Sequence, residues 1–170
     1  PKGSLGEPIH AIRALDGLDV LAESGDPEVL IVSVGAFAPM AIDAAARLRD
    51  QGIGVLVVDP RWVLPVPGSL VSLAQRARLV VVLEDGVRQG GVGSAVSQAL
   101  RDARVDMPVR NIGLPIAFLP HGTRDEVLAE FGLTAQEVAR SIVEEVASRL
   151  GEGRDARGEE PLAVDPHRGA

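Results

Sequence analysis

RLVVVLEDGVRQGGVGSAVSQAL, residues 78–100, places an apolar run, a glycine-rich loop and an apolar periodic segment in direct succession. The first part is a continuous β-branched run, which is typical of a strand covered on both faces. The loop holds three closely spaced glycines: Gly90, Gly91 and Gly93. The last part repeats apolar residues at helical spacing: Val92, Ala95, Val96, Ala99 and Leu100. The stretch therefore predicts a strand, a tight loop and a helix.

Two similar units precede this one. VLIVSVG (residues 29–35) is followed by an alanine-rich periodic segment, and GVLVVDP (residues 54–60) is followed by another. A fourth apolar run, VRNIGL, occupies residues 109–114. Three successive strand-then-helix units predict an α/β fold, a three-layer open sheet of mostly parallel strands with helices on both faces.

The two ends of the chain differ from this central part. Residues 1–27 are interpreted as a connecting segment from a preceding domain, with at most one short strand near residues 18–22. Residues 28–150 form the α/β domain, and two capping boxes, Thr123 with Glu126 and Thr134 with Glu137, start its last helices. Residues 151–170 have no period and are predicted to be a disordered tail. Because the sequence begins without Met, we expect a fragment of a longer protein.

Composition excludes several kinds of function. The 170 residues carry a net charge of −7 without a basic stripe, and only 2% are aromatic, so neither nucleic acid nor an anionic membrane is an expected partner. Cysteine is absent, which excludes disulfides and thiolate metal sites. No apolar run is long enough for a membrane helix and no signal peptide is visible, so we expect a cytoplasmic protein.

The glycine loop has two interpretations, nucleotide binding and close packing. A dinucleotide fingerprint needs a third glycine, but Val96 stands there after Gly91 and Gly93, and the P-loop motif is missing. In the packing interpretation, Gly90, Gly91 and Gly93 let the helix begin close to its neighbours, and Ser94 forms a hydrogen bond or cap there. Packing, within one chain or between two, is the favoured interpretation.

Polar residues at two strand ends are the next candidates. Glu84 and Asp85 lie at the end of one strand. Because neighbours along a strand point to opposite faces, we do not expect the two carboxylates to act together in acid–base catalysis. We expect them to form hydrogen bonds with the loop or with a helix N-terminus. Asp59 and Arg61 follow another. An arginine fork could grip a phosphate, yet an internal ion pair or an interface contact is favoured. We expect the ring of Trp62 to be buried between elements or subunits.

The histidines complete the set of candidates. His10, His121 and His167 lie far apart and lack metal-ligand spacing. His121 precedes a helix cap, and for it a structural role is favoured over that of a catalytic base. The residues alone therefore predict a small α/β domain with no assembled active site.

Three segments together resemble a known family. VDPRWVLPV, LEDGVRQGGVGSAV and NIGLPIAFLPHGTRDEVLAEFGL occur in the order and spacing of the C-terminal domain of 1-deoxy-D-xylulose-5-phosphate synthase. The resemblance extends from about residue 1 to 150. The glycine-rich run alone is shared with transketolases and with the decarboxylating component of 2-oxoacid dehydrogenases. The resemblance thus implies a transketolase C-terminal-domain-like fold.

The resemblance also implies a function for the longer enzyme. In this family two preceding domains hold thiamine diphosphate and a divalent metal such as magnesium. The enzyme decarboxylates pyruvate and joins the two-carbon unit to glyceraldehyde 3-phosphate, which makes a precursor of isoprenoids, thiamine and pyridoxal phosphate. The third domain contributes structure and dimer contacts. The chain is therefore expected to bind no cofactor or metal alone, to be inactive alone, and to work as a homodimer with the preceding domains, fused or separate.

One residue carries a family role by the same resemblance. Pro1, Lys2 and Gly3 resemble the end of the family's R-Y-P-R-G stretch, whose second basic residue binds the phosphate of the aldehyde substrate. Lys2, the only lysine of the chain, is its counterpart. Three other interpretations stay open: a domain of a transketolase or 2-oxoacid decarboxylating component, a free-standing interaction module, and a nucleotide-binding domain.

Overall fold

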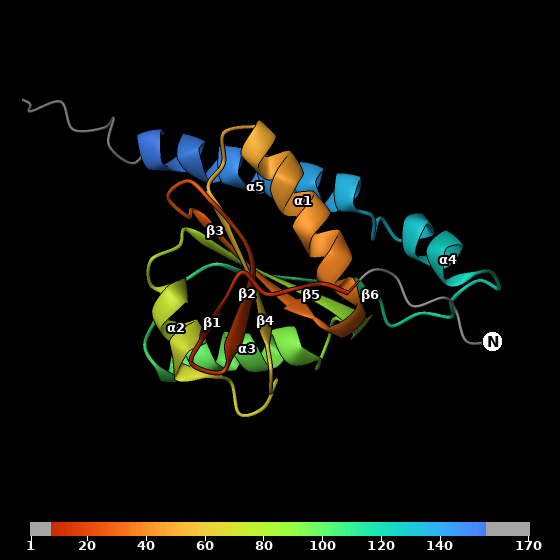
Figure 1. Ribbon diagram of the computed structural model, residues 1–170. Coiled ribbons are helices and arrows are strands. Elements are labelled where there is room, and N and C mark those ends of the chain that lie inside the picture. Colours follow the sequence, from red (N-terminus) through yellow and green to blue (C-terminus); the bar gives the residue numbers. More distant parts are fainter. Residues whose placement is uncertain (1–7, 156–170) are drawn as a thin grey trace, which may run out of the picture.

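The apolar runs form one six-stranded sheet with the strand order β1-β2-β4-β3-β5-β6. The computed structural model describes residues 8–155, and Figure 1 shows its elements in chain order. Their bounds are β1 Arg13–Leu15, β2 Leu18–Ser24, β3 Val29–Val34, a 3₁₀ turn Gly35–Phe37, α1 Ala38–Asp50, β4 Val55–Pro60, α2 Gly68–Ala74, β5 Leu79–Val87, α3 Val92–Asp102, β6 Val109–Leu114, α4 Arg124–Glu130 and α5 Ala135–Asp155. Strands β3 to β6 are parallel, and β1 and β2 are antiparallel.

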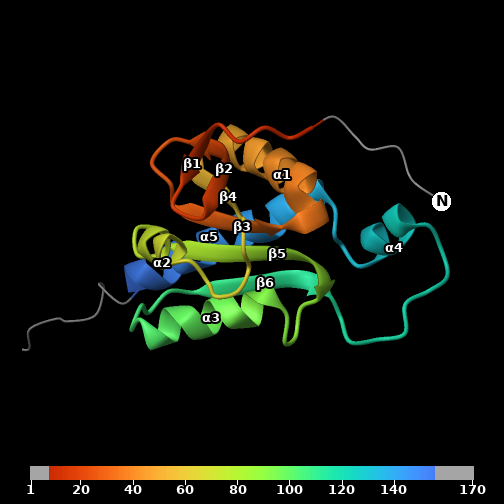
Figure 2. The same ribbon diagram turned by 60° about the horizontal axis from the view of Figure 1, so that its bottom comes forward.

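Helices cover the sheet from both sides. Helices α1 and α5 lie on one face, and α2 and α3 lie on the other (Figures 1 and 2). The central strand β3 alternates between two apolar cores, with Val29 and Ile31 on the α1/α5 side and Leu30 and Val32 on the α2/α3 side. A strand with both faces buried reads as a continuous apolar run, as this one does. The predicted three-layer α/β fold with a mostly parallel sheet is confirmed.

The sheet begins earlier than the sequence analysis expects. Strands β1 and β2 both fall within residues 1–27, for which the sequence predicts a connecting segment with at most one short strand. They form a hairpin around Asp16 and Gly17, whose φ angles are 22° and 79°. An Asp-Gly pair with two positive φ angles is a strong hairpin signal. Because Leu18 and Val20 are fully buried in the core, this hairpin belongs to the α/β domain.

The last helices begin at the predicted threonines. Thr123 and Glu126 form a complete capping box at α4, and the hydrogen bonds from Thr123 lower the pKa of Glu126. Thr134 accepts from the amide of Glu137 at 3.3 Å at the start of α5. That helix continues to Asp155, five residues past the expected end of the domain, and the rest of the predicted tail lies outside the described residues. Within residues 8–155, no helix is both long enough and apolar enough to cross a membrane.

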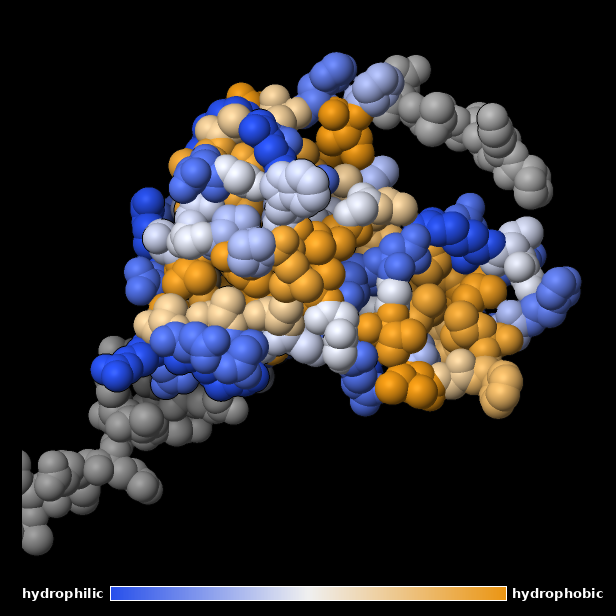
Figure 3. Space-filling model, turned by 90° about the horizontal axis from the view of Figure 1, so that it is seen from below, coloured by the Kyte–Doolittle hydropathy of each residue, from blue (hydrophilic) through white to orange (hydrophobic). Residues whose placement is uncertain are grey.

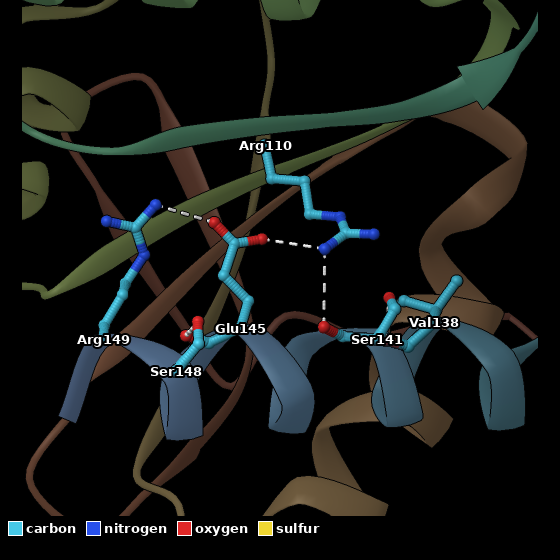
Figure 4. A network of polar contacts seen from close by, with 6 residues as sticks. All are labelled: Arg110, Val138, Ser141, Glu145, Ser148 and Arg149. Carbon is cyan, nitrogen blue, oxygen red and sulfur yellow. Dashed lines mark hydrogen bonds and ion pairs between the residues drawn. The ribbon is translucent and has the colours of Figure 1, made fainter. Parts of the chain in front are cut away.

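An ion-pair network joins α5 to the edge strand β6 (Figure 4). The guanidinium of Arg110 on β6 donates to a carboxylate oxygen of Glu145 at 2.8 Å, and Arg149 donates to the other oxygen at 2.8 Å. Arg110 also reaches the carbonyl oxygen of Ser141 at 3.4 Å. Burial alone would raise the pKa of Glu145, but the hydrogen bonds and charges of Arg149 and Arg110 outweigh it, so the net pKa is lowered. The carboxylate of Glu145 therefore stays ionised and holds α5 on the sheet.

Replacing Glu145 by Gln should destabilise the domain by about 1 kcal/mol at neutral pH, because the partly exposed pair loses its charge. A carboxylate with a lowered folded-state pKa stabilises the fold above its unfolded pKa, and this contribution is lost as the pH falls through the folded value. Urea unfolding should therefore show a smaller difference in the free energy of unfolding between the wild type and Glu145→Gln at about pH 3 than at about pH 7. Glu144→Gln, at the exposed neighbouring position, is the control, and an E145Q difference of equal size at both pH values would contradict the assignment.

Candidate functional site

The carboxyl ends of four parallel strands lie along one edge of the sheet. Strands β3, β4, β5 and β6 end at Val34, Pro60, Val87 and Leu114. Open α/β sheets bind their ligands at this edge. Most of the predicted site residues lie here, so this edge is the candidate functional site.

Glu84 occupies the place where a phosphate would bind. Its side chain is 5% exposed and points to the α3 side of β5. One carboxylate oxygen accepts from the amide of Val92 at 2.8 Å, and the other accepts from the amide of Gly93 at 3.2 Å. Amides at a helix N-terminus carry partial positive charge and favour an anion. Because the protein's own carboxylate takes these donors, the glycine loop offers no phosphate cradle.

The glycines permit this close contact. A Cβ atom on Gly91 would lie 2.1 Å from Oε2 of Glu84, and one on Gly93 would lie 2.3 Å from Oδ1 of Asn111 on β6. Gly90 has a φ of 78°, and its amide donates to the hydroxyl of Ser94 at 3.0 Å. A larger residue at Gly91 or Gly93 would push α3 away from the sheet. The loop is therefore built for packing within the chain.

Asp85 points to the opposite face, as alternation along a strand requires. It pairs with Arg124, the first residue of α4, at 2.8 Å. The guanidinium of Arg124 also lies 5.6 Å from the ring centroid of Phe37, within the range of a cation–π contact. Glu84 thus fixes the start of α3 and Asp85 fixes the start of α4, and the two carboxylates do not face a common site.

Arg61 is likewise engaged within the chain. It pairs with Asp19 on β2 at 2.6 Å, and this hydrogen bond lowers the pKa of Asp19. Asp59 lies opposite Asp19 in the strand register, and burial, followed by the charge of Asp19, raises its pKa. A lone arginine already paired with a carboxylate has little capacity left for a phosphate.

Other polar groups do not converge on a ligand. His121 is exposed in the loop before α4, and Lys2 lies outside the described residues. Over the described part of the chain, no group of three or more His, Asp or Glu side chains is placed to hold a metal ion. Within residues 8–149, two buried side-chain oxygens lack partners, Ser33 Oγ and Asn111 Oδ1, but strand alternation and pairing place them on opposite faces of the sheet.

A groove of about 260 Å³ between β6 and α5 is lined by three arginines, of which only Arg88 has no ion pair within residues 8–149. Two of its arginines, Arg110 and Arg140, are paired with Glu145 and Glu137. Their guanidinium groups are therefore partly neutralised before any ligand arrives.

Exposed apolar side chains are the feature that the sequence analysis missed. The expected burial of Trp62 between elements of this chain is wrong, because Trp62 is 76% exposed in the loop after β4, with Leu64 exposed beside it. Its expected burial between subunits stays a prediction. The loop after β6 exposes three more: Ile116, Phe118 and Leu119. These residues lie in the proline-bounded segments RWVLPVP and LPIAFLP, where apolar residues follow a strand end without helical or strand periodicity. That combination was the available signal for a contact surface.

This arrangement defines the class of the protein: an α/β domain whose strand-end site is closed by its own side chains and whose neighbouring loops are apolar. The chain belongs to the family described as "Transketolase, C-terminal domain", whose model matches residues 19–138.

Its relatives among curated proteins are much longer. The chain is 57% identical over 151 residues to "1-deoxy-D-xylulose-5-phosphate synthase" of Mycolicibacterium gilvum, covering 87% of this chain and 24% of the relative. It is 51% identical over 169 residues to "1-deoxy-D-xylulose-5-phosphate synthase 2" of Streptomyces coelicolor, covering 98% of this chain and 26% of the relative. The chain thus spans about a quarter of the length of these proteins.

Solved structures show the same fold. A chain described as "Split gene transketolase, inactive beta4 tetramer" has a TM-score of 0.67 at 32% identity, and the match covers 78% of this chain and 43% of that one. A transketolase from Pichia stipitis, a mutant complex with xylulose 5-phosphate, has a TM-score of 0.59 at 20% identity, over 80% of this chain and 19% of that one. The second likeness is one of fold alone.

Gly91→Ala should lower the free energy of unfolding by about 2 kcal/mol, because the new Cβ displaces a buried carboxylate from two amide hydrogen bonds. Gly68→Ala is the matched control, since a Cβ there meets open space at the start of α2. That control should be neutral or stabilising by about 0.5 kcal/mol. Denaturant unfolding measures both, and equal stability of the two variants would contradict the role given to Gly91.

Proposed function

We propose that this chain is the C-terminal domain of a 1-deoxy-D-xylulose-5-phosphate synthase. That enzyme combines pyruvate with glyceraldehyde 3-phosphate and releases CO₂. Identities of 50% and above to proteins of this name over nearly the whole chain support the proposal. A transketolase is the second candidate, supported by the 32% identical split-gene chain.

The contribution of this chain is support and assembly. The observation that carries this conclusion is the carboxylate of Glu84 on the α3 amides, which fills the strand-end site of the domain. The described residues fit neither the diphosphate of thiamine diphosphate nor its metal, since the helix amides are taken and no acidic or histidine cluster is present among them. Cofactor and magnesium are held by the preceding domains, and the chain alone is inactive.

Assembly gives the exposed loops a use. Apolar residues gathered at one end of a domain mark a contact surface. The split-gene transketolase is described as a tetramer of one kind of chain. We propose that this chain also belongs to an enzyme that self-associates, as a homodimer. The chain works in the cytoplasm together with the thiamine-diphosphate-binding domains, which are either fused to it or separate.

Joining this chain to the preceding three quarters of the Streptomyces coelicolor relative tests the function. The fusion should form 1-deoxy-D-xylulose 5-phosphate from pyruvate and glyceraldehyde 3-phosphate when thiamine diphosphate and magnesium are supplied. The isolated chain should form none, and the truncated relative should have much less activity than the fusion. A fusion that transfers a two-carbon unit from a ketose phosphate but does not consume pyruvate would favour the transketolase alternative.

Lys2 can be tested in the same fusion, although it lies outside the described residues. If its ammonium group binds the aldehyde phosphate, Lys2→Ala should raise KM for glyceraldehyde 3-phosphate about tenfold and leave KM for pyruvate unchanged. Lys2→Arg, which keeps the charge, is the control and should restore most of the affinity. An equal rise in both KM values would show that Lys2 does not bind the phosphate.

A further inference from the structure

The groove between β6 and α5 has a charge opposite in sign to that of the whole chain. Among the described residues that line it are three arginines and one glutamate: Arg88, Arg110, Arg140 and Glu137. The chain as a whole carries a net charge of −7. The groove holds about 260 Å³, just below the range of about 300–1,000 Å³ that is typical of small-molecule sites. Its size therefore suits a small ligand, and its charge attracts an anion.

Two of the arginines keep N–H donors for such a ligand. Arg88 is exposed and has no ion pair within residues 8–149. Arg110 bonds Glu145 and the carbonyl oxygen of Ser141 through a single nitrogen, Nη1. Figure 4 shows its guanidinium lying between β6 and α5. Because a guanidinium has five N–H donors, these two bonds leave Arg110 with donors for an anion in the groove.

The third arginine is oriented by a weak ion pair. Arg140 bonds Glu137, three residues earlier on α5, through Nη2, and the two side chains are 65% and 38% exposed. An exposed pair of this kind is screened by water and stabilises the protein little. Arg140 can therefore exchange Glu137 for a ligand with little loss of stability.

The wall of the groove below these charges is apolar. Four apolar side chains contribute to it: Ile112, Phe131, Leu133 and Val138. Leu133 and Val138 are buried in the core, and Ile112 and Phe131 are half-buried against it. Sites for small organic ligands combine such an apolar surface with a few polar groups that fix the orientation of the ligand. The lining thus suits a ligand with an anionic group at one end and an apolar group at the other.

The residues of the groove are not those of the exposed apolar loops. Figure 3 looks at the molecule from below, the side of α2 and α3 in Figure 1, and shows apolar side chains near the centre of this face and toward α4. The groove lies beside α5 on the other face of the sheet, and its lining includes no residue of the loops 61–67 and 115–119. A ligand in the groove and a protein on the loops would therefore use different residues.

We propose that this groove binds a small phosphate monoester that carries an apolar group. A phosphate monoester has up to two negative charges near neutral pH and three acceptor oxygens, which matches three arginines. Arg88, with Arg110 and Arg140, binds the phosphate through charge-assisted hydrogen bonds, and the apolar group packs on Phe131 and Val138. The inference goes beyond the proposed function and does not rest on it. A metal-bound diphosphate is not the ligand, because the described residues hold no acidic or histidine cluster for the metal.

Isothermal titration calorimetry of the chain with phenyl phosphate tests the class of ligand. Phenyl phosphate should bind saturably at a single site, and increasing salt should weaken the binding because the phosphate contacts are partly exposed. Inorganic phosphate lacks the apolar group, and benzoate carries one charge on two oxygens, so each should bind about tenfold more weakly. Equal binding of either compound, or no saturable binding of phenyl phosphate, would overturn the inference.

Three variants locate the site. Arg88→Ala should weaken the binding of phenyl phosphate about tenfold, because the phosphate loses charge-assisted hydrogen bonds. Arg101→Ala is the matched control, since Arg101 is an exposed arginine at the end of α3 on the other face of the sheet, and it should leave the affinity unchanged. Glu137→Gln should strengthen binding about threefold, because it frees Arg140 and removes a negative charge from the groove.

The opposite signs of these effects separate binding from folding. A gain of affinity in Glu137→Gln cannot result from a damaged fold, and equal thermal unfolding of Arg88→Ala and the wild type without ligand shows that a lost affinity is not a lost fold. Equal effects of Arg88→Ala and Arg101→Ala, or weaker binding by Glu137→Gln, would overturn the inference.

Discussion

The contact between Glu84 and the start of α3 places a carboxylate where solvent cannot reach it. Removing an ionised carboxylate from water is costly unless the group is fully hydrogen-bonded. The amides of Val92 and Gly93 meet this requirement, and the positive end of the helix adds a favourable field. This arrangement brings α3 so close to β5 and β6 that Gly91 and Gly93 have no room for a side chain. One buried carboxylate thus fixes the start of α3, while Val96 and Leu100 pack the rest of the helix into the apolar core.

The same contact decides what the domain can bind. A glycine loop between strand and helix normally leaves its amides free for a ligand phosphate. Here Glu84 supplies the anion from within the chain. The loop therefore has the local geometry of a phosphate site, but its amides are already hydrogen-bonded to a carboxylate. The ion pair between Arg61 and Asp19 likewise leaves the nearby guanidinium with little capacity to bind a phosphate. The loops at this edge also expose large apolar side chains, and apolar loops suit a macromolecular partner better than a small charged one.

The sequence was sufficient for the layered fold because periodicity and strand alternation are local signals. Continuous apolar runs identified β3, β4 and β5, and alternation correctly separated Glu84 from Asp85. The hairpin at Asp16 and Gly17 carried a recognisable turn signal, but β1 is only three residues long and was missed. Pairing partners were not predictable, since Arg61 contacts Asp19 and Arg124 contacts Asp85 across 42 and 39 positions of sequence. The ring of Trp62 is not buried between elements of this chain, because hydrophobicity indicates burial without saying in which molecule.

Two consecutive carboxylates at the end of β5 organise both sides of the domain. Glu84 fixes α3 on one face, and Asp85, one residue later, holds Arg124 and the start of α4 on the other. The two contacts differ in strength, because Glu84 is buried whereas Asp85 and Arg124 are partly exposed and screened by water. The buried side of the strand end therefore supports the body of the fold, and the more exposed side holds the start of α4. A single strand end thus links the packing of the core to the loop that exposes Ile116, Phe118 and Leu119.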